Sequence, residues 1–204
     1  MIDRAGFSTR FDVPRETIDK LDTYAALLSE WQTRMNLVGP STLPHIWHRH
    51  FADSAQLLPI AGRGKRWLDI GAGAGFPGLV IATLDPDARI TLVESIAKKC
   101  RFLETVAEAL QLGDRVTVEN RRIEALPRQP FDVITARALA SLDKLLAWGR
   151  PFATPSTLWL LPKGMRWSEE VTGAEQQFRF SLAHQPSLTD DQARLLLIRQ
   201  VSAR

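Results

Sequence analysis

The stretch RWLDIGAGAGFPGLVIATL, residues 66–84, decides the fold of this chain. Its first residues form an apolar run that predicts a buried strand over 66–70, and its last residues predict a helix over 78–84. Four glycines, at positions 71, 73, 75 and 78, connect the two. Glycine lacks a Cβ atom, so the backbone can turn tightly and a ligand can approach it. The stretch therefore predicts a cradle for a nucleotide, since the first N–H groups of a helix favour an electron-rich ligand.

Two nucleotides compete for this cradle. The spacing Gly73-x-Gly75-x-x-Gly78 satisfies the dinucleotide fingerprint, which favours NAD. Asp69 favours S-adenosylmethionine (SAM), because a carboxylate at the end of the strand would repel a pyrophosphate but could face the sulfonium and ammonium of SAM. An acidic residue followed by Gly-x-Gly-x-Gly also resembles the SAM-binding loop of Rossmann-like methyltransferases. A turn without a ligand is the third alternative, and the entropy cost of so many glycines argues against it.

Length and composition restrict the class of protein. A chain of 204 residues, 45% of them hydrophobic, fits one domain with a small extension. Its net charge of +3 is compatible with a nucleic-acid partner but does not require one. The single cysteine, Cys100, excludes a disulfide framework and a cysteine zinc cluster. We recognise no signal peptide and no membrane-spanning run, so we expect a cytoplasmic protein without a membrane partner.

Helical patterns come before the glycine loop. Residues 1–11 predict a loose arm, and helical spacing then predicts an amphipathic helix to about Met35. Shorter helical stretches are expected after Ser41 and over 50–58. We therefore divide the chain into an N-terminal helical extension over 1–62, packed on a SAM-dependent methyltransferase domain over 63–204.

Strands and helices alternate after residue 63, which predicts an α/β fold. Strands are expected over 66–70, 89–94, 115–119, 131–136, 157–162, 178–184 and 193–201, and helices over 78–84, 96–110, 122–126, 142–152 and 168–177. The short loop between the last two strands predicts an antiparallel hairpin. The result is a Rossmann-like, mostly parallel seven-stranded sheet with a C-terminal antiparallel hairpin, as in SAM-dependent methyltransferases.

Residues at the ends of the next three strands are candidates for binding the cofactor. Glu94 lies about 20 residues beyond the glycine loop, where an acid accepts hydrogen bonds from the ribose that SAM and NAD share. Ile123 and Glu124 would flank the adenine ring, and a polar loop that opens a short helix is an equal alternative. Arg137 ends the fourth strand and should project over the cofactor or the target.

Missing motifs indicate the kind of methyl acceptor. The chain has no Asn/Asp-Pro-Pro-aromatic sequence of amino-group methyltransferases and no Pro-Cys nucleophile of C5-pyrimidine enzymes. The target should therefore already be nucleophilic. Guanine N7 fits, because it has an exposed lone pair and its methylation removes no proton. Catalysis would then depend on positioning and electrostatics, and we identify no catalytic residue.

The segment 45–54 carries a polar cluster. Its three histidines, at 45, 48 and 50, do not converge on one helical face, so we expect no metal site. Arg49, His50 and Asp53 lie at helical spacing and can bond each other or a phosphate. A solvent-facing helical turn without a ligand is the alternative.

Several motifs together point to one family. They are the glycine loop 68–78 with its Phe-Pro-Gly end, Arg49-His50-x-x-Asp53-Ser54, Trp31 with Asn36-Leu37, Arg137-Ala138, and Lys163-Gly164. From about Tyr24 to the C-terminus the chain resembles the ribosomal small-subunit methyltransferase G family, also called glucose-inhibited division protein B. The resemblance implies SAM-dependent methylation of guanine N7 in 16S ribosomal RNA, with 16S rRNA or the small ribosomal subunit as partner of a monomer.

The resemblance also implies roles for individual residues. By match of position it implies cofactor contacts from Gly71, Phe76, Ile123, Glu124 and Arg137. The local patterns described above add Asp69, Gly73 and Glu94, and the glycine loop would hold the methionine end of SAM. RNA contacts are expected from Arg49, His50 and Lys163. An NAD-dependent oxidoreductase is one alternative, although the chain lacks a Tyr-x-x-x-Lys motif. A non-catalytic RNA-binding module and a small-molecule methyltransferase are the others.

Overall fold

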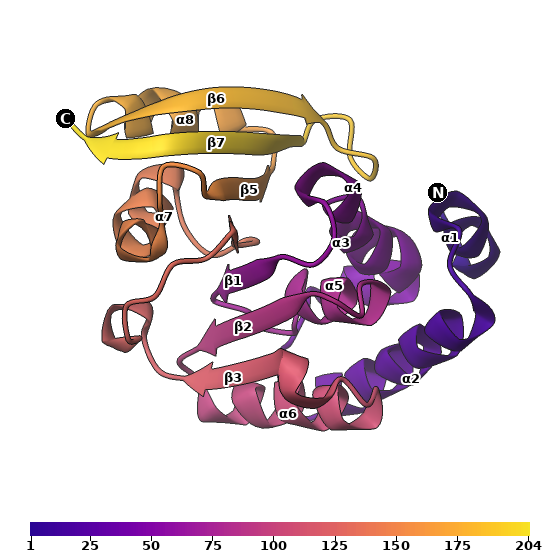
Figure 1. The fold of residues 1–204 in the computed structure, drawn as a ribbon. Helices are drawn as coiled ribbons and strands as arrows, with labels where there is room; N and C mark the ends of the chain where they lie inside the picture. The colour runs from indigo at the N-terminus through magenta and orange to yellow at the C-terminus, as the bar shows by residue number, and fades with distance from the viewer.

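The computed structural model describes residues 1–204 and contains one sheet of seven strands between two layers of helices (Figure 1). The strands are β1 (Arg66–Ile70), β2 (Arg89–Glu94), β3 (Val116–Asn120), β4 (Val133–Thr135), β5 (Leu158–Lys163), β6 (Phe178–Pro186) and β7 (Arg194–Ala203). Their order is β3-β2-β1-β4-β5-β7-β6. Strands β1 to β5 run parallel, and β7 is antiparallel to β5 and β6. The mostly parallel sheet with an antiparallel C-terminal hairpin is confirmed.

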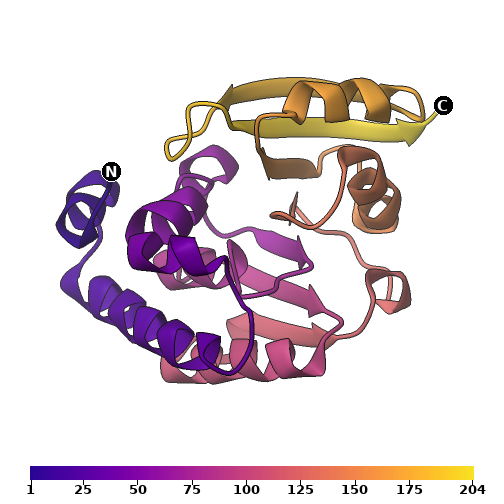
Figure 2. The same ribbon diagram turned by 180° about the vertical axis from the view of Figure 1, so that it is seen from behind.

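Helices flank the sheet on both sides (Figures 1 and 2). The longer ones are α1 (Arg4–Phe11), α2 (Arg15–Gln32), α5 (Gly78–Leu84), α6 (Ala97–Ala109), α7 (Leu142–Gly149) and α8 (Trp167–Glu175). The short turns are η1 (Pro40–His45), η2 (Trp47–Ala52), α3 (Asp53–Ala55), α4 (Leu58–Ala61), η3 (Gly113–Arg115), η4 (Ile123–Ala125) and η5 (Arg150–Phe152). Three expected elements, β1, β2 and α5, have the predicted bounds.

Side chains alternate across the sheet and build two hydrophobic cores. Along β5, Leu158 and Leu160 join a cluster of 33 buried residues with α2, α5 and α6. Trp159 and Leu161 point the other way, into a cluster of 19 buried residues with α7 and α8. Parallel strands are normally covered on both faces, which explains why β1 and β5 are buried almost throughout.

The first residues differ from the expectation. Residues 4–11 form helix α1, not a loose arm, and the side chain of Asp3 caps it by accepting a hydrogen bond from the Gly6 N–H at 2.8 Å. Phe7 is fully buried, and its ring lies 5.3 Å from that of Trp47. The prediction was wrong because the partner that stabilises this helix lies far along the chain.

The N-terminal helices pack directly on the sheet side that α5 and α6 cover. Tyr24 of α2 is fully buried in the same cluster as residues of β1 and β2. One hydrophobic core contains residues of both the extension over 1–62 and the domain over 63–204. The division between the two parts stays a prediction. No helix combines the length and the apolar character needed to cross a membrane.

Candidate functional site

A cavity of about 690 Å³ lies at the carboxyl ends of β1 and β4. Strand β1 lies between β2 and β4, so the chain leaves it in one direction and returns on its other side; such a reversal opens a crevice where ligands bind. Eight of the residues expected to bind cofactor or RNA line the cavity: Gly71, Gly73, Phe76, Glu94, Arg137, Arg49, His50 and Lys163. Asp69, Ile123 and Glu124 are not among its lining residues.

The glycine loop forms one side of the cavity with its bare backbone. Gly71 and Gly73 have φ angles of +68° and +58°, which side chains rarely tolerate. A Cβ atom on Gly71 would lie 2.6 Å from the side chain of Leu139. The Gly73 N–H donates to Glu94 Oε2 at 3.1 Å, and the Ile96 N–H donates to Glu94 Oε1 at 2.9 Å. The Glu94 carboxylate is thus held in place at the cavity wall.

Asp69 lies behind the glycine loop and does not line the cavity. Its carboxylate is fully buried, and its Oδ2 accepts a hydrogen bond from the Gly78 N–H at the start of α5, at 2.9 Å. Burial raises the pKa of this carboxyl to about 7, although the Gly78 hydrogen bond opposes the shift. Side chains alternate along β1, and this one points under α5. The expected contact of this carboxylate with the cofactor stays a prediction, and in the structure its Oδ2 bonds the start of α5.

The two residues expected at the adenine ring lie away from the cavity. Ile123 is buried in the second hydrophobic core, and Glu124 is exposed. Ile96, two residues after the end of β2, lines the cavity and is 49% exposed. The adenine contacts of Ile123 and Glu124 stay a prediction. Sequence reasoning missed Ile96 as a cavity residue. The available signal was an apolar residue two positions after the strand that ends in Glu94.

Phe76 is the centre of a stack of rings. The rings of Tyr24 and His50 stack on it with centroids 5.2 and 4.8 Å away. The guanidinium carbon of Arg137 lies 4.9 Å from the Phe76 ring centre, within the range of a cation–π contact. The Tyr24 hydroxyl donates a hydrogen bond to the Ala74 carbonyl. The N-terminal extension therefore fixes the far side of the glycine loop.

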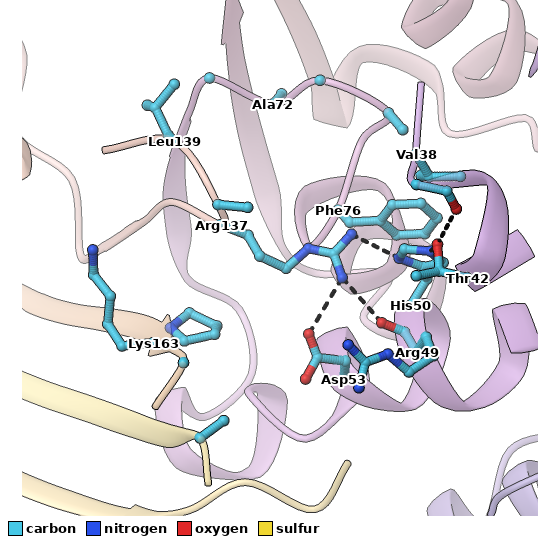
Figure 3. A pocket seen from close by; sticks show the side chains of 18 of the residues that line it. Val38, Thr42, Arg49, His50, Asp53, Ala72, Phe76, Arg137, Leu139 and Lys163 are labelled. Carbon is cyan, nitrogen blue, oxygen red and sulfur yellow. Dashed lines mark hydrogen bonds and ion pairs between the residues drawn. The ribbon is translucent and has the colours of Figure 1, made fainter. Parts of the chain in front are cut away.

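Hydrogen bonds define the protonation of His50 (Figure 3). Arg137 Nη2 lies 2.9 Å from His50 Nδ1, and a guanidinium can only donate, so Nδ1 accepts. Nε2 then carries the proton and donates to the Thr42 hydroxyl at 2.8 Å, which in turn donates to the Gly39 carbonyl. Burial is the main cause, and the charge of Arg137 the second, that lowers the pKa of His50 to about 3. His50 is therefore a neutral acceptor for Arg137.

Asp53 joins three segments that are distant in the sequence. Its Oδ2 lies 3.3 Å from Arg137 Nη1, and the same Nη1 donates to the Arg49 carbonyl at 3.1 Å (Figure 3). Its Oδ1 accepts from the Thr189 hydroxyl, in the loop between β6 and β7, at 2.6 Å. We call Arg49, His50, Asp53, Arg137 and Thr189 the polar wall. Sequence reasoning missed Thr189, because a polar loop residue gives no signal.

Of the three residues expected to contact RNA, only Arg49 has a substantially exposed side chain. That side chain is 45% exposed and lies 3.8 Å from Asp190. His50 is 6% exposed, and both its ring nitrogens have partners within the protein. Lys163 is buried, with its Nζ 2.7 Å from both the Ala140 carbonyl and Glu170 Oε2. The RNA contacts expected from Arg49, His50 and Lys163 stay a prediction, and the side chains of His50 and Lys163 already have partners within the protein.

Comparison with known proteins gives consistent results. A family model described as GidB, rRNA small subunit methyltransferase G, matches residues 17–196. Proteins named ribosomal RNA small subunit methyltransferase G include one from Methylorubrum populi, 46% identical over 98% of this chain and 96% of that protein, and one from Methylorubrum extorquens, 48% identical over 93% and 92%.

Solved structures share the fold at low sequence identity. A SAM-dependent O-methyltransferase from Thermotoga maritima superposes with a TM-score of 0.61 at 14% identity, over 94% of this chain and 73% of that one. An O-methyltransferase from Bacillus cereus in complex with SAH superposes with a TM-score of 0.57 at 15% identity, over 92% of each chain. The sheet described above is therefore the fold of SAM-dependent methyltransferases.

Proposed function

The chain belongs to the rRNA small subunit methyltransferase G family, and from this premise we propose that it transfers a methyl group from SAM to N7 of a guanine in 16S rRNA. Family membership supports the ribosomal RNA of the small subunit as substrate. The choice of guanine N7 comes from the resemblance and from the chemistry of the acceptor, because a ring nitrogen with a lone pair needs no general base.

One observation carries the proposal: two glycines with left-handed backbone conformation and the fixed carboxylate of Glu94 meet at a cavity large enough for SAM. Gly71 and Gly73 leave the backbone bare, and Glu94 is anchored to the Gly73 N–H. A cavity of about 690 Å³ is in the range of small-molecule sites. These residues fit SAM: the loop would hold its methionine end, and Glu94 would accept hydrogen bonds from its ribose hydroxyls.

The chain would contribute position and charge to the reaction. SAM supplies a methyl carbon on a sulfonium, which is electrophilic enough to react with a ring nitrogen. Arg137 is held by His50, Asp53 and the Arg49 carbonyl, so its charge stays at one place on the cavity wall. Because no proton is lost from N7, this chemistry requires no general base. Positioning of two bound reactants can supply a large part of a rate enhancement.

The alternatives receive less support. An NAD-dependent oxidoreductase and a non-catalytic RNA-binding module have no counterpart among the relatives described above, which are named as methyltransferases. Calorimetry with SAM and with NAD separates the first alternative, and binding of NAD alone would contradict the proposal. The monomeric state stays a prediction.

A methyl-transfer assay tests the proposal directly. The protein is incubated with labelled SAM and with small subunits from a strain that lacks the gene, and the RNA is digested and analysed by mass spectrometry. We expect 7-methylguanosine at one position of 16S rRNA. Gly71→Val should abolish transfer, because its Cβ would fill the cradle. Gly113→Val is the matched control, because Gly113 also has a positive φ but lies outside the cavity. Labelled protein or labelled lipid without labelled rRNA would refute the proposal.

A further inference from the structure

A second cavity adjoins the first where the target base would have to enter. It has a volume of about 530 Å³ and shares Ala138, Leu139, Ala140 and Glu170 with the cofactor cavity. An RNA base that accepts a methyl group must lie next to the cofactor, and enzymes that modify bases take them out of the stack into such a space. The shared residues are therefore the place to look for groups that distinguish one base from another.

Two charged groups at this junction are fixed in place but retain free hydrogen-bonding capacity. Glu170 Oε2 accepts from Lys163 Nζ at 2.7 Å and from the Leu142 N–H at 2.9 Å, whereas Oε1 has no partner in the protein. The Lys163 ammonium has three N–H donors, of which Ala140 and Glu170 occupy two. The junction thus presents a charged acceptor beside a charged donor.

An acceptor beside a donor is complementary to one edge of guanine. Guanine presents the donors N1–H and N2–H₂ next to the acceptor O6, whereas adenine presents an acceptor at N1 next to a donor at N6. Unstacked RNA bases are commonly read along this Watson–Crick edge. With the edge directed at Glu170 and Lys163, the N7 atom on the other side of the base points away from the pair.

Leu139 would complete the base site. Its side chain is 43% exposed although it is apolar, and it belongs to the lining of both cavities. It also lies over the glycine loop, since a Cβ on Gly71 would touch it. Figure 3 shows Leu139 and Lys163 on the side of the cavity opposite Phe76 and His50. An apolar surface beside the loop can pack against the face of a flipped base.

We propose that Glu170 and Lys163 form the guanine-reading subsite, with Glu170 accepting from N1–H and N2–H₂ and Lys163 donating to O6. This inference rests on the proposed function and adds to it the residues that select the base. It also explains why Lys163 is buried and paired, which a lysine that contacts RNA phosphates need not be.

The test compares two substrates with the complete protein. The methylated guanosine is first located with the wild-type protein, and 16S rRNA is then assembled with guanosine or inosine at that position. Inosine lacks the N2 amino group but keeps N7, O6 and N1–H. The wild-type protein should prefer guanosine about tenfold in kcat/KM, because a hydrogen bond to a charged group is lost with inosine.

The variants assign this preference to a residue. Glu170→Gln should slow transfer to guanosine about tenfold and reduce the preference for guanosine over inosine to about twofold or less. Glu175→Gln, an exposed residue of the same helix, should behave as the wild type. SAM affinity, measured by calorimetry, should be unchanged in both variants.

Two outcomes would overturn the subsite. A wild-type protein that methylates both RNAs equally would exclude it, and this measurement does not depend on whether any variant folds. A folded Glu170→Gln protein that keeps the full preference would exclude Glu170 as the reader. If the wild-type reaction yields no 7-methylguanosine, the proposed function fails and the subsite fails with it, whereas transfer without discrimination overturns the subsite alone.

Discussion

The glycine loop and the polar wall line one cavity and meet at Phe76, yet they are built in opposite ways. The loop is continuous in sequence, and its ligand-binding capacity comes from backbone that lacks side chains. The polar wall gathers side chains from the extension, from the end of β4 and from the hairpin loop, and hydrogen bonds hold them together. The loop is therefore sensitive to added atoms, and the wall is sensitive to lost partners.

The largest effect is expected from an added methyl group in the loop. A Cβ on Gly75 would lie 2.5 Å from Leu79 Cδ1 and 2.6 Å from the Tyr24 hydroxyl, at a φ of +87°. Gly75→Ala should lower the free energy of unfolding by about 4 kcal/mol, the sum of backbone strain and overpacking. Chemical denaturation measures this value.

Gly113 provides the matched control for that substitution. It has a φ of +58°, but a Cβ atom added there would have no neighbour within 4 Å. Gly113→Ala should therefore show the backbone strain alone, about 1–2 kcal/mol. Equal losses in the two variants would show that close packing around Gly75 contributes nothing.

The next effect concerns the pH dependence of the free energy of unfolding. Asp69, behind the glycine loop, and His50, in the polar wall, change it in opposite directions as pH rises. The pKa of Asp69 is raised from 3.8 to about 7, so the folded state binds the extra proton and stability falls as pH rises through this range. The pKa of His50 is lowered from 6.5 to about 3, so stability is lost as pH falls from 6.5. Between about pH 4 and 6.5 the two slopes, each about 1.4 kcal/mol per pH unit, should nearly cancel.

Removing one of the two groups should reveal the pH dependence of stability that the other contributes. In Asp69→Asn only His50 still contributes a slope, so stability should rise with pH between about pH 4 and 6.5. His50→Asn places an amide oxygen near Nδ1, where it can still accept from Arg137, and stability should then fall with pH. Urea denaturation at several pH values measures both. Asp132 and Asp143 have lowered pKa values and so titrate below this window. Curves parallel to that of the wild type would contradict the assignment.

A smaller effect is expected when the wall loses its central acceptor. Asp53→Ala removes the acceptor that Arg137 Nη1 and the Thr189 hydroxyl share in a largely buried place, which should cost about 2 kcal/mol of stability. Methyl transfer should fall as well, because Arg137 then keeps only His50 and the Arg49 carbonyl as partners. Asp190→Ala is the control: its 3.8 Å pair with Arg49 is exposed and should contribute no more than about 0.5 kcal/mol. Equal losses would refute the central place of Asp53.

The same difference explains what the sequence could predict. The strands, α5 and the place of Glu94 follow from local patterns, and the ends of these elements lie within two residues of the predicted bounds. The direction of a side chain is harder to predict from sequence: Asp69 lies on β1 as predicted, but its side chain points under α5. Contacts such as Asp53 with Thr189, or Lys163 with Glu170, depend on segments that only folding brings together.

The smallest effect is expected where loop and cofactor would share one carboxylate. Glu94 binds the Gly73 and Ile96 N–H groups, one with each oxygen, so Glu94→Gln must place an NH₂ group against one of these donors. It also loses the charged acceptor for ribose. We expect SAM to bind about tenfold more weakly by calorimetry, which corresponds to about 1.4 kcal/mol. Glu104→Gln, on the exposed side of α6, should leave the affinity unchanged. Unaltered affinity in the Glu94 variant would mean that this carboxylate stabilises only the glycine loop. The ribose contact would then have to be sought elsewhere around the cavity, beginning with the backbone after β2.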